Sequence, residues 1–171
     1  KDVPAPVVVP QADAAVARVK TKVPPVAATG TPPVDEAVEL ALTWLAGHQD
    51  PDGKWNCDDF MEHDREGAPC SGPGDPLHDV GVTGLAVLTF LSAESPSKPG
   101  AYRAQIQRGI DWLESQQSLE GQSVGLIGTD ASHHFIYDHA IATVALCQAF
   151  GASKDNALEN TAQRAINFLE V

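Results

Sequence analysis

The chain has 171 residues with 11 basic and 23 acidic side chains, which gives a formal net charge of −12. An acidic chain does not attract a phosphate backbone, so its charge argues against nucleic acid as a partner. No apolar run approaches the ~20 residues that span a bilayer, and the first residues lack the apolar segment of a signal peptide.

Residues 1–34 hold seven of the 13 prolines, mixed with Ala, Val and Thr. Proline fixes φ and removes an amide donor, so this stretch favours extended backbone, with a short helix at 12–19 between the proline clusters. We expect a Pro/Ala/Val-rich linker or tether, or else a disordered tail. A tether would join the chain to a membrane segment or another domain upstream of residue 1, and the compartment stays open.

Five amphipathic or apolar segments predict helices after the linker. The first begins at Thr31–Pro33, where Thr31 can cap it, and the 51–53 turn ends it. The second and fourth are nearly uncharged, which predicts burial on nearly all sides, with Gly151 capping the end of the fourth. The first helix has only a narrow polar stripe, Glu36, Glu39 and Thr43, which predicts that it packs on two sides. The first, third and fifth helices should lie outside the second and fourth. The second to fifth predicted helices cover about 79–93, 101–117, 137–150, and 156 to the last residue.

The outer helices share a pattern that marks an internal repeat. Trp44, Trp112 and Phe168 align, and each is followed by Leu, as in Leu45 and Leu113. A small residue stands three positions before each aromatic residue: Ala41, Gly109 and Ala165. Paired helices that repeat in this way predict stacked helical hairpins, and the small residues let neighbouring helices come close.

The segment WLAGHQDPDGKW, Trp44 to Trp55, resembles the QW-type repeat of squalene–hopene and oxidosqualene cyclases. That repeat combines an aromatic–Leu pair, a Gln and a Gly-x-Trp, matched here by Trp44–Leu45, Gln49 and Gly53–Lys54–Trp55. The second copy keeps Arg108–Gly109, Trp112–Leu113, Gln117 and Gly121, and has Ser123 where the family has Trp.

The wider class of this resemblance includes protein prenyltransferase β subunits and other α/α toroids. It implies a ring of helical hairpins over residues 35–171, in which the Gln and Trp of a repeat tie a helix end to its neighbour. A full ring needs roughly twice these repeats, so we expect a partial toroid, with its third repeat incomplete. The residues with this structural role are Trp44, Leu45, Gln49, Gly53, Trp55, Gly109, Trp112, Leu113, Gln117, Gly121 and Phe168.

The loop at 56–78 contains residue types that bind zinc, namely Cys57, His63, Cys70 and His78. Prenyltransferases use an Asp–Cys–His zinc site, but their Asp-x-Cys pattern is absent because Asp58 follows Cys57. The cysteine spacing also matches no standard zinc motif. We therefore predict no cofactor and a solvated acidic loop, with zinc or a Cys57–Cys70 disulfide as the alternatives. Cys147 should pack as a small apolar residue.

Four carboxylates are candidates for acid catalysis. Hopene-type cyclases protonate their substrate with an Asp-x-Asp-Asp motif, and Asn56–Cys57–Asp58–Asp59 comes closest but lacks the first Asp. Asp79 and Asp138 stand at equivalent helix starts, where helix capping explains them. A catalytic acid needs an environment that keeps it protonated, and the sequence supplies none.

Another group combines imidazoles, a carboxylate and a hydroxyl at the start of the fourth helix. Three histidines and an aspartate within seven residues can bind a metal or act as a base. No Gly-x-Ser-x-Gly elbow accompanies the serine, so we expect a polar loop tip. The group is Ser132, His133, His134, Tyr137, Asp138 and His139.

These patterns predict an all-α, α/α-toroid-like domain at 35–171 behind a linker at 1–34. The catalytic motifs of the resembling families are missing, so the predicted function is non-catalytic binding or scaffolding, with a protein or the remaining repeats as partner. The alternative is a squalene-type cyclase or prenyltransferase-like enzyme whose catalytic residues lie outside the chain. An aromatic-lined cavity would favour the enzyme, and a polar, loop-rimmed opening would favour the scaffold.

Overall fold

A computed structural model of the chain describes residues 34–64, 70–93 and 99–170. Within these ranges the structure contains helices and one isolated antiparallel bridge, between Gln117 and Ile127, but no strand. The elements are α1 (Val34–Gly47), η1 (Phe60–His63), η2 (Pro76–His78), α2 (Asp79–Ala93), α3 (Arg103–Ser115), α4 (Phe135–Ser153) and α5 (Asn156–Leu169). The predicted all-α fold class is confirmed.

The helix ends follow local sequence signals with two corrections. α2 occupies the predicted range, whereas α4 begins two residues early and continues through Gly151 to Ser153. The residue that ends α4 is Lys154, which adopts a left-handed φ of 58° and donates its backbone N–H to Phe150 O. α5 ends at Leu169 with Glu170 as its C-cap, short of the predicted continuation.

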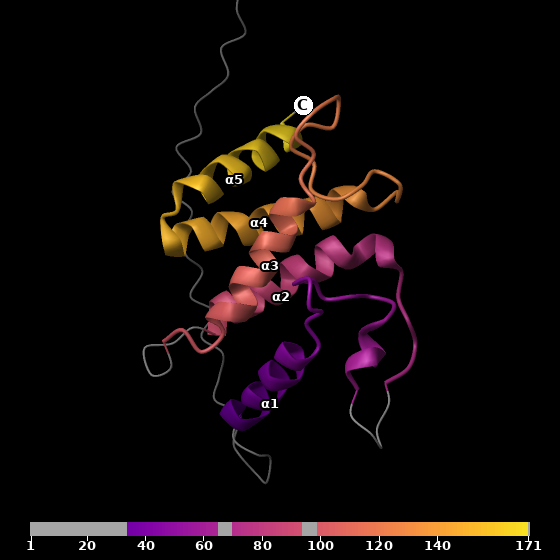
Figure 1. Cartoon of the computed structure of the whole chain (residues 1–171), viewed down its shortest axis with the longest axis vertical. Helices are drawn as coiled ribbons and strands as arrows, with labels where there is room; N and C mark the ends of the chain where they lie inside the picture. The colour runs from indigo at the N-terminus through magenta and orange to yellow at the C-terminus, as the bar shows by residue number, and fades with distance from the viewer. Residues whose placement is uncertain (1–33, 65–69, 94–98, 171) are drawn as a thin grey trace, which may run out of the picture. The chain divides into compact units, whose positions relative to one another are not determined.

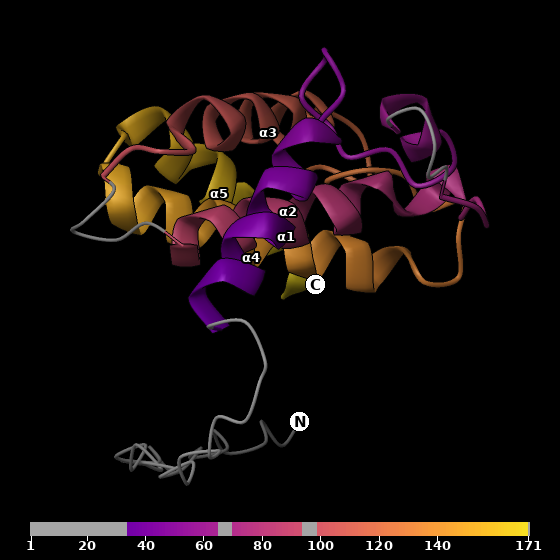
Figure 2. The ribbon, with the colours of Figure 1, turned by 90° about the horizontal axis from the view of Figure 1, so that it is seen from below.

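The inner layer consists of α2 and α4, which lie side by side at the centre of the core (Figure 1). Gly84 allows this close approach, because an added Cβ there would lie 3.1 Å from the backbone of Ala142 in α4. α3 packs on α2 and α5 packs on α4, so each outer helix covers the inner helix that precedes it (Figure 2). Gly109 of α3 contacts Val87 of α2 so closely that a Cβ would lie 2.6 Å from its Cγ2.

One side of the inner layer is open, which corrects the prediction that these helices are buried on nearly all sides. α2 exposes Val82 and Leu85, and α4 exposes Tyr137 and Val144. The reason is geometric, because α3 packs on α2 and α5 packs on α4, and the side chains of α2 and α4 that point away from these neighbours stay exposed. A lack of charge therefore predicted the apolar character of α2 and α4 but not their exposure.

Residues 76–93 are long and apolar enough to cross a membrane by length and composition alone. Such a test also selects core helices of soluble folds, and α2 packs as a core helix here. Its Val87 and Phe90 are completely buried against the other helices.

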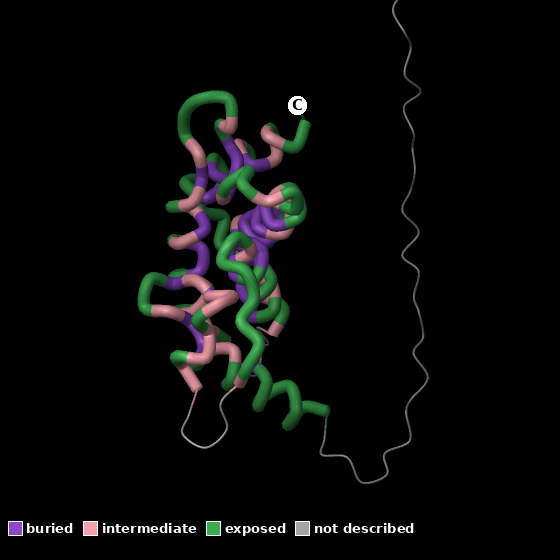
Figure 3. Tube along the Cα trace, turned by 90° about the vertical axis from the view of Figure 1, so that its right-hand side faces the viewer, coloured by how far each residue is buried: buried purple, intermediate pink, exposed green. Residues whose placement is uncertain are grey.

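α1 differs from the other helices because almost its whole surface is exposed (Figure 3). Leu42 is its buried residue, and Leu45 and Ala46 pack at the edge of the core. α1 contacts the rest of residues 33–171 mainly through its C-terminal end.

The predicted linker falls outside the described residues except for Val34, which is already the first residue of α1. The predicted helix at 12–19 and the Thr31 cap lie outside them as well.

Candidate functional site

Gln49 links the turn after α1 to α3. Its buried side-chain amide donates to Gly53 O at 2.8 Å and to Gln105 O at 3.0 Å. Its oxygen accepts from Arg108, from Nε at 3.1 Å and from Nη2 at 2.5 Å. We call this arrangement the Gln clamp, and it joins one repeat to the next through both ends of a single amide.

A second Gln clamp joins the turn after α3 to α5. Gln117 donates to Gly125 O at 3.3 Å and to Thr161 O at 2.9 Å, and Arg164 Nε donates to its oxygen at 2.7 Å. The two arginines were not singled out as clamp residues, although the shared Gln-Arg-Gly and Gln-Arg-Ala sequences at 107–109 and 163–165 were a signal for them.

The glycine of the second clamp is Gly125, and the assignment of Gly121 to this role was wrong. A Cβ on Gly125 would overlap Arg164 O, just as a Cβ on Gly53 would overlap Arg108 O, whereas Gly121 has open space around it. The Gln–Gly spacing is four residues in the first turn and eight in the second, because the second turn holds an insertion.

When Gly53 is aligned with Gly125, Trp55 aligns with Ile127. Ser123, the residue that the sequence alignment placed opposite Trp55, belongs to the insertion. The side chains of Trp55 and Ile127 are both buried, at 3% and 1% exposure. Trp55 donates its indole N–H to Leu45 O at 2.7 Å, and its backbone N–H donates to Thr83 Oγ1 in α2 at 3.0 Å.

Two imidazole–carboxylate pairs fix the loop after Trp55 to the turn after α1. His63 Nε2 lies 2.5 Å from Asp50 Oδ1, and His48 Nε2 lies 3.4 Å from Asp64 Oδ1. The backbone N–H of Cys70 also donates to Asp64, and this hydrogen bond lowers the pKa of that carboxyl. His63, a predicted metal candidate, is therefore the hydrogen-bond partner of Asp50 in this structure.

The cysteines are free thiols, so the Cys57–Cys70 disulfide alternative is not realised. Burial, together with the carboxylate of Asp79, raises the pKa of Cys57 to about 12. This thiol is therefore protonated at neutral pH and is a poor nucleophile. Cys147 is partly buried against the core, as predicted.

The candidate zinc ligands are dispersed over separate contacts. In residues 34–64, 70–93 and 99–170, no three His, Cys, Asp or Glu side chains form a group that could hold a metal ion. His63 pairs with Asp50, His78 pairs with Asp138, and the Cys57 backbone binds Asp79.

Asp79 anchors the preceding loop and does not cap its helix, which corrects the prediction. Its Oδ1 accepts from Cys57 N–H and its Oδ2 from Lys54 Nζ, both at 2.8 Å. The hydrogen bond to Asp79 raises the pKa of Lys54. Asp79 is not the N-cap of α2, because η2 runs directly into α2. Its φ and ψ of −53° and −36° are already helical, whereas an N-cap residue has non-helical angles.

Asp138 also binds a distant residue where capping was predicted. Its Oδ2 accepts a hydrogen bond from His78 Nδ1 at 2.8 Å, which joins the starts of α2 and α4. This hydrogen bond raises the pKa of His78. α4 starts at Phe135, so Asp138 lies inside its first turn and not at its N-cap.

Asp58 and Asp59, the other two carboxylates considered for acid catalysis, lie in the turn before η1. Both donate their backbone N–H to Asn56 Oδ1 at 3.0 Å, which makes a tight turn before η1. Their established role here is in that turn, and Asp59 is exposed.

The histidines at 133–139 point to different surroundings. His139 is completely buried, accepts from Ile127 N–H at 3.0 Å, and lies 3.1 Å from Ala165 O. Burial lowers its pKa. His133 and His134 are exposed, and Ser132 Oγ accepts from the backbone N–H of His134 at 3.0 Å. The ring of His134 lies 6.4 Å from that of Tyr137 and 6.2 Å from that of His78, the partner of Asp138. The structure therefore brings part of the group together but leaves His139 apart in the core.

A cavity of about 330 Å³ lies at the N-terminal ends of α2 and α4. Charged and aromatic residues line it, including Lys54, Asp79, Trp112, Phe135 and Asp138. Apolar side chains such as Leu77, Val80 and Ile127 make up much of the rest of its lining, so polar and apolar surface contribute about equally. Lys54 pairs with Asp79 at this wall.

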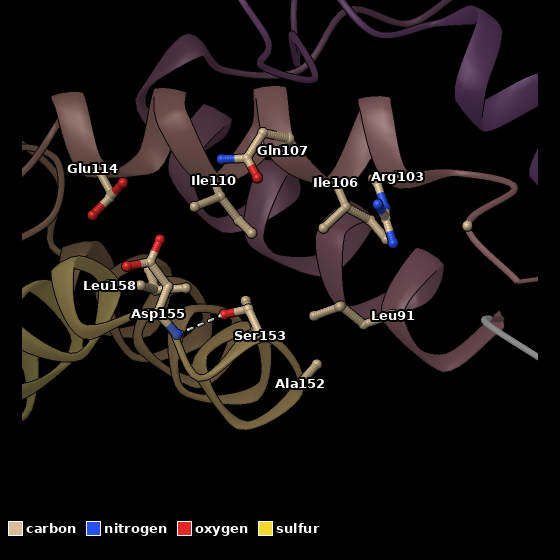
Figure 4. A pocket seen from close by; sticks show the side chains of 12 residues that line it. Leu91, Arg103, Ile106, Gln107, Ile110, Glu114, Ala152, Ser153, Asp155 and Leu158 are labelled. Carbon is tan, nitrogen blue, oxygen red and sulfur yellow. Dashed lines mark hydrogen bonds between the residues drawn. The ribbon is translucent and has the colours of Figure 1, made fainter.

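A larger groove of about 500 Å³ lies between α3 and the start of α5 (Figure 4). Leu91, Ile106, Ile110 and Leu158 form an apolar floor. Figure 4 shows Arg103 at one end of the groove, with Glu114 and Asp155 toward the other. An apolar floor between charged ends can hold a chain segment in one direction.

Comparison with protein-family models, curated proteins and solved structures finds no match to this chain. The resemblance to cyclase repeats therefore stays a prediction.

Proposed function

We propose that this chain is a non-catalytic binding module that holds a segment of a partner protein in the groove between α3 and α5. The observation that carries the proposal is the groove itself, with its apolar floor of Ile106, Ile110 and Leu158. Its volume of about 500 Å³ lies within the range of ligand-binding clefts.

The charges at the groove ends specify the chemistry of the segment. Glu114 and Asp155 suit a basic residue at one end, and Arg103 suits an acidic residue at the other. Between them the segment would present apolar side chains at helical spacing toward the floor.

The scaffold around the groove would be part of a toroid-like ring. Two successive repeats use the same Gln clamp, through Gln49 and Gln117, which supports a series of equivalent hairpins. In such a ring, further repeats or a partner chain would continue the series beyond these two clamps.

The alternative enzyme, a squalene-type cyclase or prenyltransferase-like protein, has less support. A cyclase stabilises carbocations with aromatic faces, but the residues that line the groove include no Phe, Tyr or Trp. The cavity at the helix starts has Trp112 and Phe135, but the charged side chains of Lys54, Asp79 and Asp138 also line it, unlike an apolar reaction chamber.

Selection from a phage-displayed library of random peptides tests the proposal. Gln107 lines the groove and is exposed, so Gln107→Trp should fill it without disturbing the core. Selected peptides should bind this variant at least about tenfold more weakly, a loss of about 1.4 kcal/mol.

Gln163→Trp is the matched control. Gln163 holds the equivalent position in α5 and makes the same kind of contact, to Asn167, as Gln107 makes to Asp111. Peptides that bind both variants equally well, or a library that yields no binder, would contradict the proposal.

A further inference from the structure

His139 of α4 lies where α5 and the turn after α3 meet in the core. This turn comprises residues 116–128, and we call it the second turn. The imidazole is completely buried. Its Nδ1 lies 3.0 Å from the backbone nitrogen of Ile127 in the second turn, and its Nε2 lies 3.1 Å from Ala165 O in α5. One side chain therefore holds both the second turn and α5 to α4.

The two partners determine which ring nitrogen carries the hydrogen. The N–H of Ile127 can only donate, so Nδ1 must accept and carries no hydrogen. The carbonyl of Ala165 can only accept, so Nε2 carries the hydrogen. Thr143 Oγ1, 3.5 Å from Nε2, donates its own hydrogen to His139 O at 2.8 Å and so can turn a lone pair toward Nε2. The site therefore fits the neutral imidazole.

A second proton cannot be added to this ring unless the second turn moves. The imidazolium carries a hydrogen on both nitrogens, so Nδ1–H would face the N–H of Ile127, donor against donor. Ile127 is 1% exposed, so solvent does not reach this contact in the closed structure. Proton uptake therefore requires the N–H of Ile127 to leave the ring.

The charged side chains beside these contacts are engaged by other partners. Asp138, next to His139 in α4, accepts from His78, and Arg164, next to Ala165 in α5, donates to Gln117. On the remaining sides, Asp79 of α2 accepts from Lys54, Glu114 of α3 accepts from Thr161, and Glu120 of the second turn is exposed. Burial lowers the pKa of His139, and the hydrogen bond to Ala165 O acts in the opposite direction.

The first repeat makes the same contact without a titratable group. Trp55, which aligns with Ile127, donates its backbone N–H to Thr83 Oγ1 in α2 at 3.0 Å. Thr83 is completely buried, as His139 is. A hydroxyl keeps its hydrogen at every pH at which an imidazole titrates. The two turns are thus held alike, but acid can change the acceptor of only one of them.

We propose that His139 is an acid-sensitive latch, which holds the second turn while it is neutral and releases that turn when it takes up a proton. The turn after α1, held by Thr83, stays closed under the same conditions. Gln117 and Arg164 join the second turn to α5, so the contact between this turn and α5 loosens with it.

The latch should open as pH falls below 6.5, the ordinary pKa of an imidazole. The closed state binds the proton weakly because its pKa is lowered, whereas the open state binds it at the ordinary value. The equilibrium constant for opening should therefore rise by up to about tenfold for each pH unit below that value, until the closed state is itself protonated. The pair of His78 and Asp138 changes in the opposite direction, because the pKa of His78 is raised.

Amide hydrogen exchange of the whole chain, resolved by NMR spectroscopy, tests the proposal at single residues. The exchange rate of each amide is divided into its intrinsic rate at the same pH, and this protection factor reports how often the amide opens. Between about pH 7 and about pH 5, the protection factor of Ile127 should fall at least about fivefold, whereas that of Trp55 should change less than about twofold.

His139→Gln keeps an acceptor and a donor in its side-chain amide but does not titrate, so the fall at Ile127 should disappear. His133→Gln, at an exposed histidine before α4, is the matched control and should leave the fall unchanged. Should His139→Gln fail to fold, the comparison of Ile127 with Trp55 in the wild type decides. Equal falls at both residues, no fall at Ile127, or a fall that persists in folded His139→Gln would each overturn the proposal.

Discussion

At the scale of single residues, the contact between repeats depends on an amide and a glycine. The amide of Gln117 is buried at 7% exposure and bonds to two carbonyls and an arginine. Gly125 lets the turn lie directly on the backbone of Arg164, at a φ of 94°. Because both groups face α5, the turn cannot shift without losing these hydrogen bonds.

We expect Gly125→Ala to destabilise the chain much more than Gly121→Ala. Both glycines have positive φ, which costs an alanine about 1–2 kcal/mol at either position. Only at Gly125 would the new Cβ also overlap the backbone of Arg164, so the total there should reach about 3 kcal/mol or more. Urea unfolding of the two variants measures the difference, and equal losses would contradict the assignment of Gly125 to the clamp.

The same residues show what the sequence could and could not predict. It predicted that Gln49 and Gln117 are equivalent, because each follows an aromatic–Leu pair at the same distance. The sequence assigned the glycine of the second clamp to Gly121, which has the spacing of Gly53. Because the second turn holds an insertion, the glycine that contacts the backbone of Arg164 is Gly125. The sequence pattern also took Asp79 for a cap, because the partners Cys57 and Lys54 lie more than 20 residues away in the chain.

At the scale of elements, three imidazole–carboxylate pairs hold the segment from α1 to α2. Two of them fasten the loop to the end of α1, and the third, His78 with Asp138, fastens η2 to the start of α4. The pKa of His78 is raised, first by the hydrogen bond to Asp138 and then by the charges of Asp138 and Asp75. The joint between η2 and α4 should therefore depend on pH.

We expect the contribution of His78 to stability to be larger in mild acid than in base. The folded chain holds the proton of His78 more tightly than the unfolded chain, in which the pKa has its ordinary value of 6.5. The stabilisation is therefore complete below that value and is lost as pH rises through the raised folded pKa. Because His78 is partly exposed, solvent limits it to less than about 1 kcal/mol.

Urea midpoints of the wild type and His78→Gln at about pH 5.5 and about pH 9 measure this contribution. The gap between the two proteins should be wider at the lower pH. His133→Gln, at an exposed histidine, should show no such change of gap. A gap that widens toward high pH would contradict the prediction, because the contribution of His78 to stability would then grow as the imidazole loses its proton.

At the scale of the whole molecule, the described residues, 34–64, 70–93 and 99–170, are built on an inner pair of helices, α2 and α4, on which α3 and α5 pack. Hydrophobic periodicity predicted α2 and the division into inner and outer helices, because both follow from local sequence. The open side of the inner pair and the exposure of α1 depend on which neighbours are present, which periodicity does not contain. α1 is amphipathic like α3, but no inner helix precedes it within residues 34–64, 70–93 and 99–170, whereas α2 precedes and buries α3.

This difference predicts a gradient of hydrogen exchange across the fold. Amides of α2 and α4 around Val87, Ala142 and Leu146, whose side chains are fully buried, should exchange only on global unfolding. Amides in the first half of α1, around Val38, should exchange through local opening, because little buried apolar surface holds that part of the helix. Exchange followed by mass spectrometry should be measured at low protein concentration, so that association between chains does not add protection. Protection of α1 equal to that of α2 in the monomer would mean that its exposed surface is covered by the chain itself.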